Sequence, residues 1–409
     1  MLEKNLLFKK LLYSQITAAV GETFLTIALA TLAVQITGSG IAAAWLISIN
    51  AVATFTIGFA AGWLIDRKSR KKMMLISDIA RAILLIPFFF LTSDTFWIAY
   101  ILTFFIACFS SLFHPARESY IQSVFTSEER LNIVATVQSN LSMITLIGPS
   151  IAGFLVAIIN IKLAFIINML CFIISAFYIY QIKDEPLLNT KEKGGFWPEV
   201  FSGWIYIFKN KPLLNLNITR ILLTMGLAIY AIVSYQILVE VSNNLNHVIS
   251  YVSFSLLLGI ATSLQGLGSF CAGLIIKKKK QSFIGKYDKL LVTSGLLLSV
   301  GYIAWGIGSV YIIFIGSFII GLGLVIGRIG IISIGQEIVD PEYMGRSITA
   351  GDAIARLSHI VTMGLSSTLI LILNTNILMS VAFVLALVIL LLNIKTKGGE
   401  QFGKHKKTS

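Results

Sequence analysis

The residues best suited to chemistry in this sequence are a few charged side chains inside long apolar stretches. Glu22 is the clearest case, because it lies in an apolar run in which Gln15, Thr23 and Thr26 are its polar neighbours. Removal from water favours the protonated form of a carboxyl group, so Glu22 could bind and release a proton. Two alternatives remain open: Glu22 could bind a cationic substrate, or it could be permanently paired with a buried arginine.

Two further acidic residues have an arginine at helical spacing. Asp78 and Arg81 are three residues apart, and Asp352 and Arg356 are four apart, so each pair falls on one face of a helix. We expect both to be structural or gating ion pairs more than proton carriers. Asp352 and Arg356 nevertheless remain candidates for proton coupling or substrate binding. His359 lies on their face, and we expect a packed histidine more than a proton carrier.

Arg220 and Arg328 are also inside apolar stretches but have no acidic partner nearby in the sequence. They are candidate cations of an internal cavity, and Glu22 could pair with either one. We expect no metal site and no disulfide, because the three cysteines all lie in apolar runs and are typical of buried thiols. They are Cys108, Cys171 and Cys271.

The elements that carry these residues are membrane-spanning helices. Of the 409 residues, 56% are hydrophobic and 12% are charged, whereas soluble domains carry about 25% charged residues. This composition excludes a soluble enzyme, and it excludes a disordered chain. A spanning helix needs about 20 mostly apolar residues. The sequence offers twelve such stretches: 11–34, 41–65, 73–92, 95–114, 134–158, 163–182, 213–239, 249–276, 290–307, 310–335, 347–373 and 377–394.

The basic residues predict the orientation of these helices. Of the 32 lysines and arginines, all but five fall in the two tails and in alternate loops, which an even number of spans places on one side. By the positive-inside rule, that side and both termini are cytoplasmic. The net charge of +13 is therefore mainly an orientation signal. It also favours contact with anionic membrane lipid, and we do not expect nucleic-acid binding.

A polar stretch divides the chain into two six-helix bundles. We predict an N-terminal bundle over 1–182, a cytoplasmic linker over 183–211, a C-terminal bundle over 212–394 and a basic cytoplasmic tail over 395–409. The linker contains an apolar stripe at helical spacing, which predicts an amphipathic helix that lies on the membrane surface or packs on the protein's own helices. The stripe consists of Trp197, Val200, Phe201, Trp204, Ile205 and Phe208.

Short motifs recur in the two halves at similar offsets. The sequence GWLID at 62–66 corresponds to GLIIK at 273–277, and Gln122 with Glu128 corresponds to Gln336 with Glu342. Duplicated units of this kind build secondary transporters, in which the substrate site lies near the middle of the membrane. At about 1.5 Å per residue, Glu22 lies near that depth.

One loop resembles a known family signature. Residues 62–71 read GWLIDRKSRK and are similar to the G-x-x-x-D-R-x-G-R-K loop of the major facilitator superfamily, with Ser69 in place of the usual glycine. The resemblance implies that Asp66 and Arg67 latch the two halves on the cytoplasmic side. The other members of this predicted gate are Gly62, Arg70 and Lys71. The alternative is that these charges only orient the chain.

Other segments resemble the drug:proton antiporters of the macrolide-efflux and bacilysin-exporter type. These segments are FHPAR at 113–117 and PEYMGR at 341–346. A third, GPSIAG at 148–153, resembles the antiporter motif G-P-x-x-G-G. Pro149 removes a helix hydrogen bond, while Gly148 and Gly153 allow another helix to approach closely. This predicts a hinge or seal, or else a packing kink without a role in coupling.

Taken together, the resemblance implies an all-α integral membrane protein with the major facilitator fold. We expect a secondary active exporter of a lipophilic or amphipathic small molecule, driven by proton antiport through alternating access. We expect it to act as a monomer in the cell membrane, without a cofactor and without enzymatic activity. The alternatives are a siderophore or metabolite exporter, a lysophospholipid transporter of the same fold and, remotely, a receptor that transports nothing.

Overall fold

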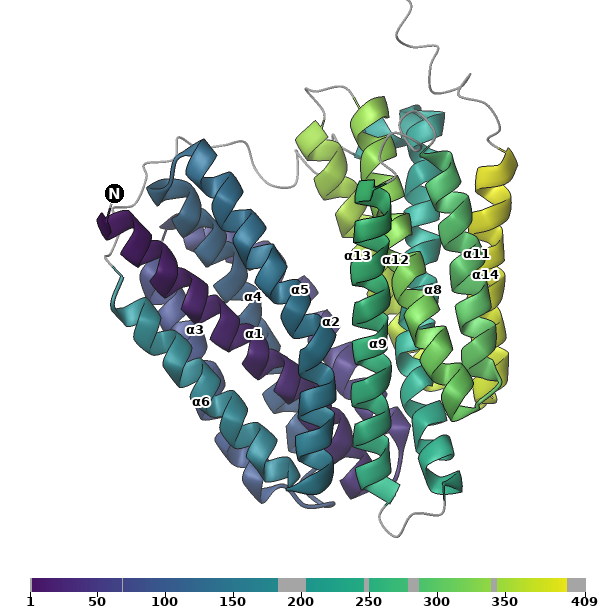
Figure 1. Ribbon diagram of the computed structural model, residues 1–409, viewed down its shortest axis with the longest axis horizontal. Helices are drawn as coiled ribbons and strands as arrows, with labels where there is room; N and C mark the ends of the chain where they lie inside the picture. The colour runs from purple at the N-terminus through teal and green to yellow at the C-terminus, as the bar shows by residue number, and fades with distance from the viewer. Residues whose placement is uncertain are drawn as a thin grey trace, which may run out of the picture. The chain divides into compact units, whose positions relative to one another are not determined.

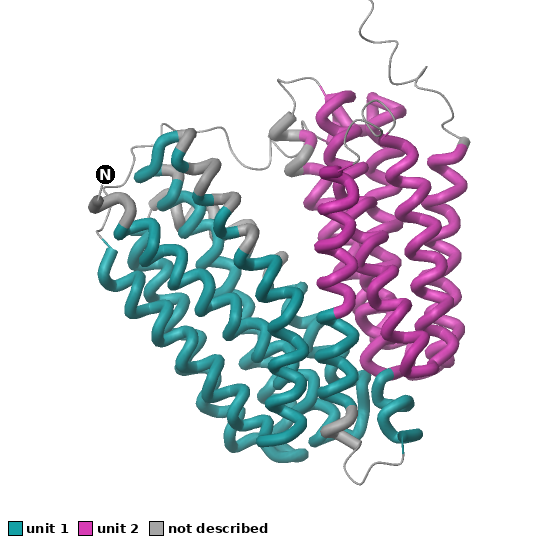
Figure 2. The backbone as a smooth tube through the Cα atoms, viewed as in Figure 1, with its two compact units in different colours: residues 1–191, 238–263 teal, residues 192–237, 264–409 magenta. Residues whose placement is uncertain are grey.

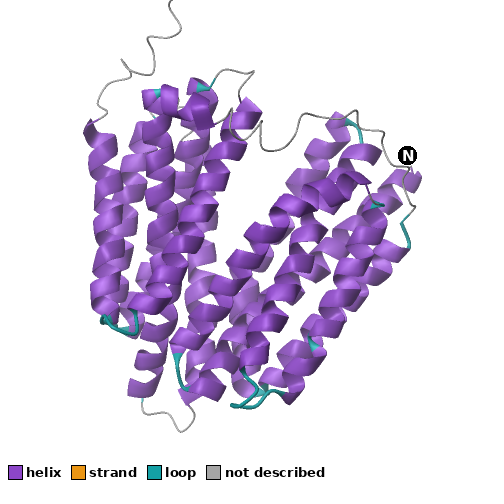
Figure 3. Ribbon diagram, turned by 180° about the vertical axis from the view of Figure 1, so that it is seen from behind, coloured by secondary structure: helices purple, strands orange, loops and turns teal. Residues whose placement is uncertain are grey.

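The computed structural model is helical throughout the residues it describes, which contain short turns but no strand (Figures 1 and 3). It describes residues 2–67, 69–182, 204–245, 250–278, 287–339 and 344–395. The chain forms two compact units (Figure 2). One comprises residues 1–191 and 238–263, and the other comprises 192–237 and 264–409. The bundle, linker and tail boundaries given above remain predictions.

The first unit contains the helices up to residue 180 and parts of two later ones. α1 is its central element, because it packs against α2, α5 and α6, while α3 packs against α4 and α6. The bounds are α1 Leu2–Thr37, α2 Gly40–Arg67, α3 Arg70–Leu84, the 3₁₀ helix η1 Ile86–Phe90, α4 Trp97–Val124, α5 Ser127–Ile158 and α6 Ile161–Tyr180.

The second unit contains the remaining helices, and α8 and α9 are shared between the two units. Their bounds are α8 Lys211–Asn244, α9 Ser250–Lys278, α11 Asp288–Gly306, α12 Val310–Ile338, α13 Met344–Leu369 and α14 Thr375–Lys395. α9 and α12 lie in backbone contact, because a Cβ added at Gly268 would fall 2.0 Å from the carbonyl oxygen of Phe318. Glycine is required here for close helix packing.

Ten of the described helices are long and apolar enough to cross a membrane. This confirms an all-α membrane protein. α2 and α13 occupy predicted stretches but are not among the ten, because parts of both lie outside the described residues; the described apolar segment of α2 is Gly40–Ala53. The count of twelve spans therefore stays a prediction.

Several helices extend beyond the predicted apolar stretches. α4 continues to Val124 instead of ending near residue 114, and α5 begins at Ser127 instead of 134. The start of α5 is fixed by a capping box, in which the backbone N–H of Thr126 donates to Glu129 Oε2 at 2.8 Å. The stretch 73–92 is divided, because the α-helix stops at Leu84 and Pro87 lies in the 3₁₀ helix η1.

Candidate functional site

The partner of Glu22 is Arg81, which belongs to the same unit. Arg81 Nη1 on α3 donates to Glu22 Oε1 on α1 at 2.9 Å. Within its own unit Glu22 therefore has a buried arginine partner, and a pairing with Arg220 or Arg328 stays a prediction. The Glu22 side chain is 36% exposed, whereas the Arg81 side chain is fully buried.

The guanidinium of Arg81 is bonded through all three of its nitrogens. Besides the bond to Glu22, Nη2 donates to Asp78 Oδ1, and Nε donates to the carbonyl oxygen of Ser77 at 3.3 Å. The rings of Phe113 and Phe172 lie 4.9 Å and 4.2 Å from the guanidinium carbon. A buried cation is tolerated where hydrogen bonds and aromatic faces replace its hydration, and Arg81 has both.

Asp78 is the second carboxylate of this group, and it is completely buried. Its Oδ2 accepts a hydrogen bond from the Ser175 hydroxyl on α6 at 2.6 Å, and Ser175 Oγ lies 2.8 Å from Ser14 Oγ on α1. The expected Asp78–Arg81 pair therefore forms, and Ser175 ties it to two more helices. We call Glu22, Asp78, Arg81 and Ser175 the arginine cluster.

Sequence reasoning missed two neighbours of Glu22, both on α4. The Ser110 hydroxyl donates to Glu22 Oε1 at 2.9 Å, and His114 Nε2 lies 3.8 Å from the same oxygen. The predicted apolar stretch 95–114 ends at His114, whereas α4 continues past it to Val124. The spacing of Ser110, His114 and Arg117 at i, i+4 and i+7 was the signal that could have revealed a polar face.

The second unit has its own ion pair, between α8 and α13. Arg220 Nη1 donates to Asp352 Oδ1 at 2.9 Å, with side chains that are 17% and 56% exposed. The pair expected within α13 therefore forms between helices instead, and both Arg356 and Arg328 are exposed. His359 Nδ1 lies 3.1 Å from the carbonyl oxygen of Thr224 on α8. The histidine thus packs against the neighbouring helix, as expected.

The predicted cytoplasmic gate is described only in part. Gly62, Asp66 and Arg67 belong to α2, but their side chains lie outside the described residues. Ser69, which replaces the family glycine, adopts φ −58° and caps α3, because its hydroxyl accepts from the backbone N–H of Lys72 at 3.3 Å. The substitution therefore needs no left-handed residue at this position.

The two other members of the gate are placed at the start of α3. Arg70 is 8% exposed, and Lys71 Nζ lies 5.5 Å from the centre of the Tyr180 ring. Both side chains thus lie against the helices of the first unit. Whether they act in a latch stays a prediction.

The segment 148–153 lies inside a continuous α5 and makes close contacts within the first unit. A Cβ at Gly148 would lie 3.0 Å from Thr23 Cγ2 of α1, and the Cβ of any residue at 153 would lie 2.5 Å from the carbonyl oxygen of Ser255 on α9. A Cβ added at Gly259 of α9 would likewise lie 2.5 Å from the carbonyl oxygen of Pro149. The expected close approach of another helix is therefore observed, while a hinge role stays a prediction.

A Gly153→Ala variant should destabilise this contact. The added methyl group has to move one of two backbones, so we expect the free energy of unfolding to fall by about 1–3 kcal/mol. Thermal unfolding of the purified protein in detergent measures the effect. Gly364→Ala is the matched control, because nothing lies within 4 Å of its Cβ. Equal changes in the two variants would contradict the close contact.

The predicted amphipathic helix of the linker is described from residue 204 onwards. Residues 204–209 are helical, and Trp204 Nε1 donates to the carbonyl oxygen of Ala350 on α13 at 3.3 Å. Ile207 is 1% exposed, whereas Ile205 and Phe208 are 55% and 63% exposed. One face thus packs on the protein's own helices and the other is open. The rest of the stripe, from Trp197 to Phe201, lies outside the described residues.

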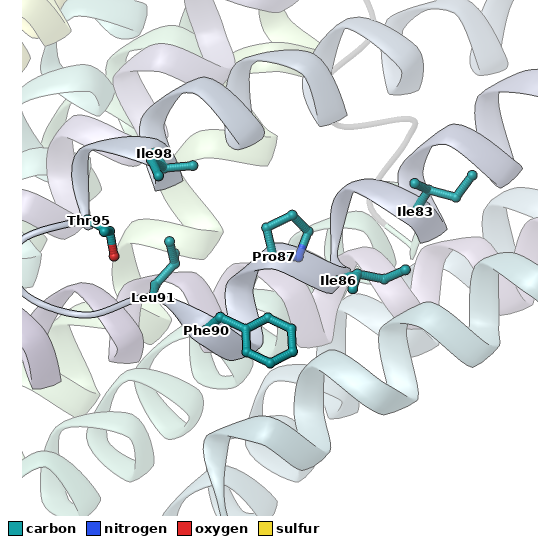
Figure 4. A pocket seen from close by; sticks show the side chains of 7 residues that line it. All are labelled: Ile83, Ile86, Pro87, Phe90, Leu91, Thr95 and Ile98. Atoms are coloured by element: carbon teal, nitrogen blue, oxygen red, sulfur yellow. The ribbon is translucent and has the colours of Figure 1, made fainter.

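A separate apolar pocket of about 490 Å³ lies where α3 gives way to η1 (Figure 4). Thr95 contributes the one polar side chain among the seven lining residues labelled there. Phe90, another of the seven, is 76% exposed. The lining includes no acid, base or cation. It is therefore suited to an apolar occupant and has no group for proton exchange.

Ten long apolar helices and a fully buried ion pair on one of them define a multi-pass membrane protein. Residues 11–363 match the family model of the Major Facilitator Superfamily, and the chain belongs to this superfamily. The protein is therefore a transporter of that superfamily and not an enzyme.

Curated relatives and solved structures agree with this assignment. The chain is 30% identical over 210 residues to the MFS-type transporter YfiS of Bacillus subtilis (strain 168), a match that spans 50% of this chain and 49% of YfiS. It is 22% identical to macrolide efflux protein A of Enterococcus faecalis, over 74% of this chain and 92% of that protein. It is 29% identical to a Bacillus subtilis protein named as a bacilysin exporter, BacE, over 42% and 44% of the two chains.

Among solved structures, the nucleoside transporter NupG superposes with a TM-score of 0.73 at 12% identity. The match covers 95% of this chain and 98% of the NupG chain. At this identity the likeness concerns the fold. It confirms the major facilitator fold that the sequence predicts.

Proposed function

We propose that this transporter exports a lipophilic or amphipathic small molecule from the cell by proton antiport. The observation that carries the proposal is the state of Glu22, a carboxylate in the middle of an apolar helix that is bonded to Arg81 and Ser110 and still 36% exposed. A group that is both held in place and accessible can exchange a proton in every cycle. In this proposal the protein acts as a monomer in the plasma membrane, with both termini in the cytoplasm.

The proposed cycle uses alternating access of the two units. Glu22 releases its proton towards the cytoplasm, the substrate binds, and the units change to an outward-open arrangement. Protonation of Glu22 from outside then promotes substrate release and return. Asp66 and Arg67 stabilise one end state, and the segment 148–153 acts as the hinge or seal. Besides protons and the substrate, we propose membrane lipid as a partner of the transporter.

The direction of transport is supported by two relatives. One is named for macrolide efflux and the other for bacilysin export, although their identities to this chain are only 22% and 29%. Neither macrolides nor bacilysin are assigned to this chain as its substrate. Together they favour export over uptake.

A second candidate is export of an anionic metabolite, siderophore or lysophospholipid. It would need a cation that is free to meet the substrate, and the exposed Arg328 and Arg356 are such groups. Arg81 and Arg220 are less suitable, because each is already bonded to a carboxylate. An anionic substrate would therefore have to be bound by Arg328 or Arg356, because the buried Arg81 is neutralised within the protein.

The test is transport by the purified protein in proteoliposomes with an imposed pH gradient. A panel of lipophilic amines, neutral antibiotics and anionic lipids should reveal compounds that move against the proton flux. A protonophore should stop that movement, and protein-free liposomes are the control. Movement that depends on a sodium gradient but not on the pH gradient would refute proton antiport.

A further inference from the structure

Asp78 and Glu22 bind the same guanidinium but differ in burial and in the helix that carries them. Asp78 is fully buried, whereas the Glu22 side chain is 36% exposed. Asp78 lies on the same helix as Arg81 and is held by the Ser175 hydroxyl at 2.6 Å. Glu22 reaches Arg81 from another helix, and its own additional donor is Ser110. One carboxylate is therefore fixed and the other is accessible.

This asymmetry matters because Arg81 is buried without access to water. If Glu22 were the sole counter-ion of Arg81, its protonation would leave an uncompensated cation in an apolar core, which is strongly unfavourable. With Asp78 in place, the cation keeps a partner when Glu22 becomes neutral. The arginine cluster carries a net charge of −1 with both carboxylates ionised, and a single proton makes it neutral.

We propose that Asp78 is the permanent counter-ion of Arg81, a positioning residue that allows Glu22 to take up and release a proton. Ser175, supported by Ser14, keeps Asp78 in place for this task. The inference rests on the proposed function insofar as Glu22 is the group that exchanges the proton. It adds a role for an ion pair within α3 that would otherwise be only structural.

Other titratable groups also act on Glu22. In the described structure they come from α3 and α4: Arg81 and Asp78 on α3, and His114 and Arg117 on α4. Arg117 is itself bonded to Glu118 at 2.8 Å. Among the described residues, neither His114 nor Arg117 is hydrogen-bonded to Arg81. Replacing Asp78 therefore changes the charge balance of Arg81 directly, and it affects His114 and Arg117 only through longer-range electrostatics.

The test reads the protonation of Glu22 directly, without any substrate. Infrared difference spectra of the purified full-length protein in lipid nanodiscs record protonated carboxyl groups as the pH is varied. The band that disappears in Glu22→Gln belongs to Glu22. In Asp78→Asn, Glu22 becomes the only counter-ion of Arg81, so it should stay ionised to lower pH. We expect its midpoint to fall by about one pH unit or more, a tenfold change in proton concentration.

Two further variants make the result decisive. Asp78→Asn/Arg81→Gln also removes the cation, so the Glu22 midpoint should lie above that of Asp78→Asn. Asp94→Asn removes an exposed carboxylate of the same unit, and it should leave the midpoint unchanged. An unchanged or raised midpoint in Asp78→Asn, or a wild-type protein in which no Glu22 band titrates, overturns the proposal.

Loss of folding would also be informative. If Asp78→Asn does not accumulate as folded protein, rescue by the added Arg81→Gln substitution supports the counter-ion role, and failure of that rescue while Glu22→Gln folds normally overturns it. The outcome is separable from the proposed function. A Glu22 that titrates as described in a protein that shows no proton-coupled export would refute the transport mechanism and leave the role of Asp78 intact.

Discussion

A Glu22→Gln variant should lose pH-gradient-driven efflux completely while remaining folded. Glutamine keeps the size of the side chain and can still meet Ser110, but it cannot exchange a proton. Arg81 retains its bond to Asp78 in the variant, so no buried cation is left alone. Initial rates of substrate movement and of proton movement in proteoliposomes measure the effect, and both should fall to the level of protein-free vesicles.

The matched control for this variant is Glu337→Gln, which makes the same chemical change at an exposed position on α12. It should transport at the wild-type rate. Substrate movement by Glu22→Gln that still follows the pH gradient would remove Glu22 as the proton carrier. Asp352 would then be the next carboxylate to test, because its side chain is 56% exposed.

An Arg81→Gln variant should be the most destabilising single change in the first unit. It leaves the fully buried Asp78 without a cation, and breaking a buried ion pair from one side costs about 3–5 kcal/mol. The aromatic contacts of Phe113 and Phe172 with the guanidinium are lost as well. Thermal unfolding in detergent, together with the yield of monodisperse protein, measures the loss.

Arg220→Gln is the control for this prediction. Its partner Asp352 is 56% exposed and can be solvated after the change, so we expect a cost of about 1 kcal/mol or less. Similar losses of stability in the two arginine variants would show that burial does not determine the cost. The contrast therefore tests the physical difference between the two ion pairs.

The sequence predicts the class of fold and the identity of the important charges because both depend on local patterns. Apolar runs about 20 residues long mark spans, and Asp78–Arg81 is recognisable from its i, i+3 spacing. The same reasoning could not pair Glu22 with Arg81, because 59 residues separate them and helix packing alone decides which of several arginines is nearest. Asp352 shows the converse, since its local partner Arg356 is displaced by the more distant Arg220.

Helix ends explain the remaining differences. Hydropathy reports only the part of a helix that lies in lipid, so it ends α4 near His114 although the helix continues to Val124. As a result, hydropathy alone does not reveal that His114 lies close to Glu22. Capping patterns carry the missing information, as the Thr126–Glu129 box at the start of α5 demonstrates.

The location of Asp78 and Arg81 on one helix also bears on how the protein is made. Each of these charges alone raises the cost of inserting a helix into the bilayer by about 2.5–3.5 kcal/mol. Because α3 carries both, it enters the membrane with its own neutralising partner. Glu22 is synthesised earlier and acquires its cation only when α3 arrives. The arginine cluster thus forms when α3, which already carries the Asp78–Arg81 ion pair, packs against the Glu22 carboxylate that was synthesised before it.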